Sequence, residues 1–280
     1  MDNISLPSLD ARRYAETFAV FLQRSLEYDL MAAEIERVIR TRLRGSIRML
    51  DIGAGTGCVI ANLVQRSGLA FAAYTAFEPN PAHVEVLRTV LADLPFPTRL
   101  QARGFGQNVE IEGTHDFALF SHSLYWMPDP AAAMLHAADS LAPGGVAMAL
   151  IQGPYAAHAL FHLFEDQYQR LTPMLQNNRI SSHELVAGLR SRGLEPEVRM
   201  LRTPVDLTGL FDAGHEHELG EFMSFLLQLE YRDLPDRLQR DIAQYVEGGC
   251  VEADARLLWY LPNASVVISR PADGQVVAES

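Results

Sequence analysis

Three glycines and a downstream acid form the pattern in this chain that is best suited to holding a ligand. Gly53, Gly55 and Gly57 follow the apolar run Ile47–Ile52 at a spacing of two residues. Glycine lets a backbone turn sharply and approach a ligand closely, and the helix that starts after such a turn presents free N–H groups. Glu78 lies roughly 20 residues further on, the offset at which a carboxylate accepts hydrogen bonds from ribose hydroxyls. The spacing therefore predicts a site for a nucleoside-containing cofactor.

A second group of reactive side chains follows another apolar run. Ser121, His122, Tyr125 and Trp126 come directly after the predicted strand 115–120. In an open α/β sheet, ligands bind outside the carboxyl ends of the strands, so these side chains are well placed for a site. Histidine exchanges protons near neutral pH, which suits a general base. A histidine among aromatic residues is also a common core arrangement, and both interpretations stay open at this stage.

The elements that position these residues alternate between strand and helix. Apolar runs bounded by turn residues predict strands, and apolar residues at three- and four-residue spacing predict helices. The predicted strands are 47–52, 72–77, 98–102, 115–120, 146–151 and 198–204, and the helices between them are 58–67, one opening at Pro81, 129–141 and 181–192. Residues 143–145 are predicted as a turn. This order predicts an α/β, Rossmann-like, doubly wound sheet of seven mostly parallel strands.

Helical patterns dominate the two ends of the chain. Residues 11–44 are predicted as helical, and residues 156–173, 216–230 and 234–247 give further helices. Segments 257–260 and 265–269 are β-type and predict a closing hairpin with the seventh strand.

We accordingly predict four parts along the chain. Residues 1–45 form a helical lid, 46–152 the cofactor-binding core, 153–270 the rest of the core with a substrate cap, and 271–280 a frayed tail.

Composition excludes several classes of protein. The net charge is −12 and the chain contains no lysine, so it lacks the basic clusters that bind DNA or RNA. Cys58 and Cys250 are single and far apart, which argues against a disulfide framework or a zinc site. The first ten residues lack the features of a signal peptide, and no apolar stretch is long enough to cross a membrane. We therefore expect a cytoplasmic protein without a membrane, nucleic-acid or metal partner; its oligomeric state does not follow from the sequence.

The glycine pattern also resembles a known family. LDIGAGTG and FEP resemble motifs I and II of the class I S-adenosylmethionine (SAM)-dependent methyltransferases, and SLAPGGVAMALI resembles the turn before their fifth strand. The resemblance spans roughly residues 45–152. It implies SAM as cofactor and S-adenosylhomocysteine as product. The cofactor-binding residues that we expect, from this resemblance and from the pattern, are Asp51, Gly53, Gly55, Gly57, Glu78, His83, Gln107 and Ser121.

Three further stretches resemble the histamine N-methyltransferase family. FLQRSLEYDLMAAEI is similar to the helix that supplies a substrate-binding glutamate there, which corresponds to Glu27. FALFSHSLYWMPDP is similar to the segment that supplies a glutamine, and His122 stands at that position. LLWYLPNASVVI is similar to the region that supplies an asparagine, where this chain has Leu261 or Tyr260, with Asn263 nearby. Because two of the three substrate residues differ, the resemblance does not imply histamine as the substrate.

The chemistry that these residues suit is in-line methyl transfer to an amine nitrogen of a small molecule, in a bacterial specialised pathway. Glu27 would attract the cationic amine, and His122 with Tyr125 would accept its proton. Aromatic side chains would contact a cation through their faces. The substrate-binding residues that we expect are Tyr14, Glu27, Trp126, Tyr155 and Tyr260. Two alternatives remain: a cyclase that converts SAM into azetidine-2-carboxylate and methylthioadenosine, and a SAM-binding protein without turnover.

Overall fold

The computed structural model describes residues 4–106, 108–164, 167–170 and 180–272, and it divides the chain into two compact units. The sheet unit comprises Tyr28–Ile151, Ile180–Leu201 and Asn263–Ser280. The helical unit comprises Met1–Glu27, Gln152–Arg179 and Arg202–Pro262. No helix of the described residues is long and apolar enough to cross a membrane.

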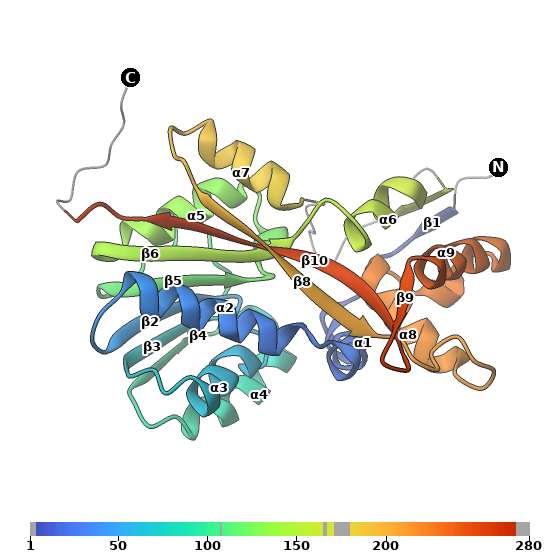
Figure 1. Cartoon of the computed structure of the whole chain (residues 1–280), viewed down its shortest axis with the longest axis horizontal. Coiled ribbons are helices and arrows are strands. Elements are labelled where there is room, and N and C mark those ends of the chain that lie inside the picture. The colour runs from blue at the N-terminus through green and yellow to red at the C-terminus, as the bar shows by residue number, and fades with distance from the viewer. Residues whose placement is uncertain (1–3, 107, 165–166, 171–179, 273–280) are drawn as a thin grey trace. The chain divides into compact units, whose positions relative to one another are not determined.

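The main sheet is open and mostly parallel, as predicted. Its strand order is β4-β3-β2-β5-β6-β10-β8, and β9 pairs with β10. The strands are β2 (Ile47–Ile52), β3 (Phe71–Phe77), β4 (Thr98–Gln101), β5 (His115–Ser121), β6 (Leu141–Gln152), β8 (Glu197–Asp206), β9 (Cys250–Ala253) and β10 (Arg256–Ser269). The pairs β2–β3, β3–β4, β2–β5 and β5–β6 are parallel. The chain first extends the sheet on one side of β2 and then on the other, which places the switch point between β2 and β5 (Figure 1).

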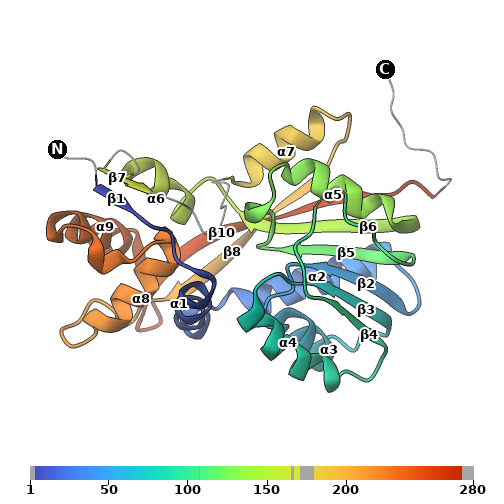
Figure 2. The same ribbon diagram turned by 180° about the vertical axis from the view of Figure 1, so that it is seen from behind.

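Helices cover both faces of this sheet, as a doubly wound fold requires. The helices of the sheet unit are α2 (Glu27–Arg42, whose first residue belongs to the helical unit), α3 (Cys58–Arg66), α4 (Pro81–Ala92), α5 (Pro130–Asp139) and α7 (Ser182–Arg190). On β2, Met49 packs in the cluster with α2, α3 and α4, whereas its neighbour Leu50 packs in the cluster with α5 and α7. The two clusters lie on opposite faces because successive strand residues point to opposite sides. Figure 2 shows these helices and the sheet from behind.

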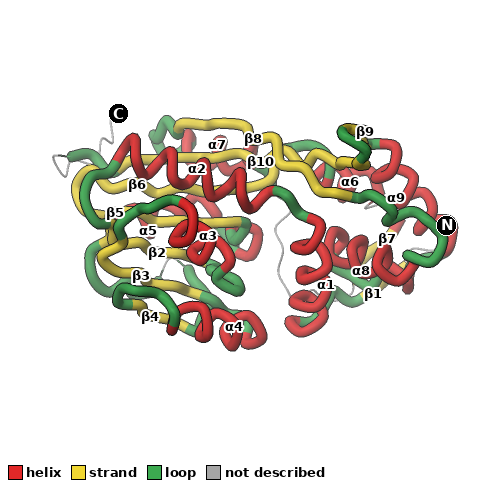
Figure 3. Tube along the Cα trace, turned by 60° about the horizontal axis from the view of Figure 1, so that its bottom comes forward, coloured by secondary structure: helices red, strands yellow, loops and turns green. Residues whose placement is uncertain are grey.

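The helical unit has its own core. It contains β1 (Ile4–Leu6), α1 (Ala11–Arg24), α6 (Ala157–Phe164), β7 (Tyr168–Arg170), α8 (Glu216–Leu227) and α9 (Asp236–Gly248) (Figure 3). Phe21 of α1 and Phe222 of α8 stack in this core, with ring centroids 6.0 Å apart.

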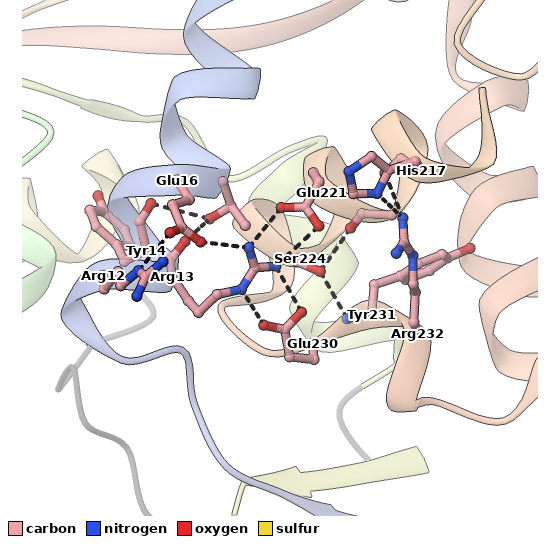
Figure 4. Close-up of polar contacts among 12 residues, drawn as sticks. Arg12, Arg13, Tyr14, Glu16, His217, Glu221, Ser224, Glu230, Tyr231 and Arg232 are labelled. Atoms are coloured by element: carbon pink, nitrogen blue, oxygen red, sulfur yellow. Dashed lines mark hydrogen bonds and ion pairs between the residues drawn. The ribbon is translucent and has the colours of Figure 1, made fainter.

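An ion-pair network joins α1 to α8 within that unit. The Arg13 guanidinium donates to the Glu230 carboxylate at 2.6 and 3.0 Å and to the Glu221 carboxylate at 3.0 and 3.1 Å (Figure 4). These hydrogen bonds, first to Glu230 and then to Glu221, raise the pKa of Arg13. Arg13, together with Arg24, which donates to Glu218, therefore links the first helix to the last third of the chain.

Replacing Arg13 by alanine should destabilise the protein. The change leaves Glu221, whose side chain is 14% exposed, without its cation, and we expect a loss of about 1–3 kcal/mol in the free energy of unfolding. Urea unfolding, monitored by circular dichroism, measures this change in the free energy of unfolding. Arg12→Ala is the matched control, since that side chain is 85% exposed and its one ion pair with a described residue is with Glu16 on its own helix. Equal losses in both variants would contradict a structural role for the network.

The predicted helix 11–44 is wrong in its middle, where the structure has two helices. Ser25 adopts an extended conformation, with φ −76° and ψ 126°, and its hydroxyl accepts a hydrogen bond from the Glu27 N–H at 3.3 Å. Leu26 then donates to the Pro204 carbonyl at 3.0 Å. Serine competes for main-chain groups in this way, and the tertiary contact with the strand completes the break.

Three other predicted elements also differ from the structure. The helix predicted over 156–173 ends at Phe164, and 168–170 form β7, which pairs with β1; residues 171–173 lie outside the described part. The predicted turn 143–145 is an irregularity inside β6, where the pairing with β5 steps from Leu141 to Val146. The predicted hairpin of 257–260 with 265–269 is instead one strand, β10, whose antiparallel hairpin partner is β9. Most of the predicted tail, residues 273–280, lies outside the described part.

Candidate cofactor and active site

The glycine turn after β2 requires glycine at each of its three positions. Gly53, Gly55 and Gly57 have φ values of 76°, 57° and 82°, in the left-handed region that L side chains rarely adopt. A Cβ on Gly53 would lie 2.3 Å from the Cβ of Ser123, so the turns after β2 and β5 touch here. A Cβ on Gly55, in contrast, would meet nothing within 4 Å. The space beside the middle glycine is thus open, and a ligand could lie there.

Glu78, at the end of β3, holds this turn in place. Its carboxylate accepts a hydrogen bond from the Gly55 N–H at 2.8 Å and another from the Asn80 N–H at 2.8 Å. The side chain is buried, and His83 in the first turn of α4 lies 3.7 Å from it. Because each carboxylate oxygen accepts more than one hydrogen bond, Glu78 retains the capacity to accept from ribose hydroxyls. The structure thus brings Glu78 and His83 together with the glycine turn.

Asp51 lies in the last part of β2 and is almost completely buried. The Tyr74 hydroxyl on β3 donates to its Oδ2 at 2.7 Å. Burial, opposed by this hydrogen bond, raises the pKa of Asp51 from 3.8 to about 7. Burial also raises the pKa of the nearby Cys58 thiol to about 11, so the thiol stays neutral.

His122 follows β5 in a conformation that non-glycine residues rarely adopt. Its φ is 52°, and its N–H donates to the Leu150 carbonyl at 2.9 Å. Its Nδ1 lies 3.0 Å from the Tyr125 hydroxyl, and its Nε2 is buried without a hydrogen-bond partner among the described residues. Left-handed residues of this kind cost about 1–3 kcal/mol and occur often at functional sites. Ser121 ends β5 directly before His122, and Trp126 ends the short 3₁₀ helix Leu124–Trp126.

The remaining predicted residues lie in the helical unit or outside the described part. Tyr14 on α1 packs against Phe225, with ring centroids 5.7 Å apart. Tyr155 and Tyr260 are exposed, and Glu27 is buried at the first position of α2. Gln107 lies outside the described residues. No group of three or more histidine, cysteine, aspartate and glutamate side chains in the described part is arranged to hold a metal ion.

The sequence patterns did not predict two residues of the site. Ser123 fills the space beside Gly53, and Tyr74 bonds Asp51. A signal for Tyr74 does exist in the sequence, because it carries a hydroxyl in the middle of the apolar strand Phe71–Phe77. A buried tyrosine hydroxyl usually finds a partner.

Fold and site together define a class of protein. A glycine turn at the switch point of a doubly wound sheet, with an acid at the end of the next strand, is a Rossmann-like cofactor site. The chain belongs to the methyltransferase domain family, whose model matches residues 22–197. The chain thus carries a methyltransferase domain with a Rossmann-like cofactor site.

Individual relatives match more distantly. An uncharacterized methyltransferase of Mycobacterium tuberculosis is 34% identical over 99 residues, which is 35% of this chain and 37% of the relative, and a Mycobacterium bovis protein matches to the same extent. The matched part is thus little more than a third of these relatives. The YcgJ protein of Bacillus subtilis has the same fold, with a TM-score of 0.56 and 13% identity over 85% of this chain and 98% of that protein.

Proposed function

We propose that this protein transfers the methyl group of SAM to an amine nitrogen of a small molecule. The observation that carries the proposal is the His122–Tyr125 pair, which lies at the carboxyl end of β5 beside the glycine turn. Methyl transfer needs a nucleophile held in line with the sulfonium methyl in a site without water. An ammonium group is not a nucleophile until it has lost a proton, so a base near the methyl group favours an amine acceptor.

The tautomer of His122 decides which nitrogen acts as the base. When Nδ1–H donates to the Tyr125 oxygen at 3.0 Å, the lone pair is on Nε2. Nε2 has no partner among the described residues, so no protein hydrogen bond holds its lone pair there. In this proposal Tyr125 fixes the ring and its tautomer, and Nε2 accepts the proton of the amine.

Charge supports a cationic acceptor. The segments that form the helical unit contain eighteen aspartates and glutamates and ten arginines. A surplus of negative charge raises the local concentration of cations. Glu27 is buried, and in this proposal its carboxylate binds the amine, while Tyr14, Trp126, Tyr155 and Tyr260 contact the substrate. The resemblance to the histamine N-methyltransferase family supports the same class of acceptor, with a substrate other than histamine.

Product analysis tests this function. Purified protein is incubated with SAM alone and with a panel of primary and secondary amines, and the products are identified by mass spectrometry. We expect S-adenosylhomocysteine and a methylated amine in equal amounts, only when an acceptor is present. Methylthioadenosine formed without an acceptor would overturn the proposal in favour of a cyclase. Bound SAM with neither product across amine, hydroxyl and thiol acceptors would favour a binding protein without turnover.

A further inference from the structure

Only one of the two Asp51 carboxyl oxygens has a hydrogen-bond partner among the described residues. Asp51 and Tyr74 are each 1% exposed, and the Tyr74 hydroxyl donates to Oδ2 at 2.7 Å. Oδ1 has no hydrogen-bond partner among the described residues. A buried polar atom without a partner is costly and therefore rare in native proteins. This carboxyl lies two residues before Gly53, the first residue of the cofactor turn.

Within the described part of the chain, no cation is among the groups that act on Asp51. Tyr74 and Glu78 act on it from β3 and the end of that strand, and Glu78 is a second acid. Cys58 faces it from the first turn of α3, and Tyr28 of α2 bonds that thiol. Burial and the neighbouring acid both favour the protonated carboxyl, and only the Tyr74 hydroxyl favours the ionised form.

We propose that Tyr74 is a positioning residue that holds Asp51 so that uptake of the cationic cofactor SAM expels a proton from this carboxyl. The O–H bond of the Asp51 carboxyl breaks, its electron pair stays on the carboxylate, and the proton leaves to solvent. The sulfonium and ammonium charges of SAM supply the positive charge that the described groups around Asp51 do not provide, and opposite charges attract strongly where water is excluded. The proposal rests on SAM as the cofactor and does not depend on the acceptor.

Tyr74 sets the pH at which this exchange occurs. Its hydroxyl hydrogen bond stabilises the carboxylate and so lowers the pKa of Asp51 relative to a site without it. The ring is buried on β3, with Tyr74 paired in register to Met49 of β2, so the hydroxyl is held at a fixed place. Removing the hydroxyl should therefore move the pH dependence of SAM binding in the alkaline direction.

Isothermal titration calorimetry of the full chain tests the proposal. SAM is titrated at pH 6, 7 and 8.5 in pairs of buffers with different ionisation enthalpies, which gives the number of protons released. For a group that titrates near pH 7, we expect release of about one proton per SAM at pH 6 and about half a proton at pH 7. Release should be absent at pH 8.5, and the dissociation constant should be about tenfold larger at pH 6 than at pH 8.5.

Variants identify the groups that release the proton and set its pH dependence. Asp51→Asn should bind SAM with no proton release at pH 6 and with a dissociation constant that no longer varies between pH 6 and pH 7. Tyr74→Phe should weaken binding at pH 7 and recover wild-type affinity by pH 9, whereas a merely structural role would weaken binding at every pH. Thr75→Val is the matched control, because it removes a hydroxyl from the same strand that faces His115 instead of Asp51.

The measurements can also overturn the proposal. SAM binding without proton release in the wild type, or release that persists in Asp51→Asn, would overturn the proposal. Failure of Tyr74→Phe to fold would leave the wild-type and Asp51→Asn measurements to decide it. Absence of SAM binding at every pH would contradict the cofactor assignment itself.

Discussion

His122→Gln should lower kcat by about 10²–10⁴-fold on the accepted amine, with little change in the affinity for SAM. Glutamine preserves a polar side chain of similar length, but it does not accept a proton near neutral pH. The loss should shrink as the pH rises, because an amine that is already deprotonated in solution no longer needs the base. Initial rates from pH 7 to 10, with SAM affinity measured separately, check both the loss of kcat and its dependence on pH.

A second variant separates the base from the group that orients it. Tyr125→Phe removes the hydroxyl 3.0 Å from Nδ1 but leaves the imidazole, so it should lower kcat less than His122→Gln does. His183→Gln is the control, since this histidine lies on α7 and outside the proposed site. A His122→Gln enzyme with wild-type kcat would place the base elsewhere and leave His122 with a packing role.

Local spacing was sufficient to predict the glycine turn after β2 and the position of Glu78 directly after β3. Gly53, Gly55, Gly57 and Glu78 act through backbone conformation and a hydrogen bond across two neighbouring strands. Both are determined by residue type and by distance along the chain. The capping box at Ser181 and Glu184 was predictable for the same reason, because its partners are three residues apart.

Features that depend on distant contacts could not be predicted in this way. The break after α1 needs Pro204 to accept from Leu26, and β7 exists because it pairs with β1 more than 160 residues away. Pro262 lies inside β10, although proline usually interrupts a strand, and its carbonyl accepts from Gly153. The partnership of Tyr74 with Asp51 likewise follows only from the register of β3 on β2.

Stability of the cofactor-free protein should depend on pH through Asp51, in the direction opposite to an ordinary carboxylate. Burial raises the pKa of Asp51 to about 7, against 3.8 for the unperturbed group. Between these values the folded protein holds a proton that the unfolded chain has released. The stabilising contribution is therefore complete below about pH 4 and is lost as the pH rises through 7. A shift of this size corresponds to at most about 4 kcal/mol in the free energy of unfolding.

Asp51→Asn should remove this dependence. An amide keeps the oxygen that accepts from Tyr74 and carries no charge, so the variant should gain stability over the wild type above pH 7 and gain nothing below pH 4. Its new NH₂ group lacks an acceptor, because Oδ1 of the wild type has no partner among the described residues, and this offsets part of the gain. We expect a net gain of about 1–3 kcal/mol at pH 8, measured by urea unfolding without cofactor.

Asp116→Asn is the control, because the pKa of Asp116 is shifted in the opposite direction from that of Asp51. Burial alone would raise the pKa of Asp116, but its hydrogen bonds with Arg48 lower it below 3.8. Its contribution is therefore present above that pH and lost in acid, so Asp116→Asn should destabilise the protein at pH 8. If Asp51→Asn also destabilised the protein at pH 8, the folded state would favour the ionised carboxyl, which would then carry its charge at pH 6 as well. The charge that SAM meets at the glycine turn would then be present before the cofactor arrives, and the proton exchange inferred for Asp51 would be excluded with it.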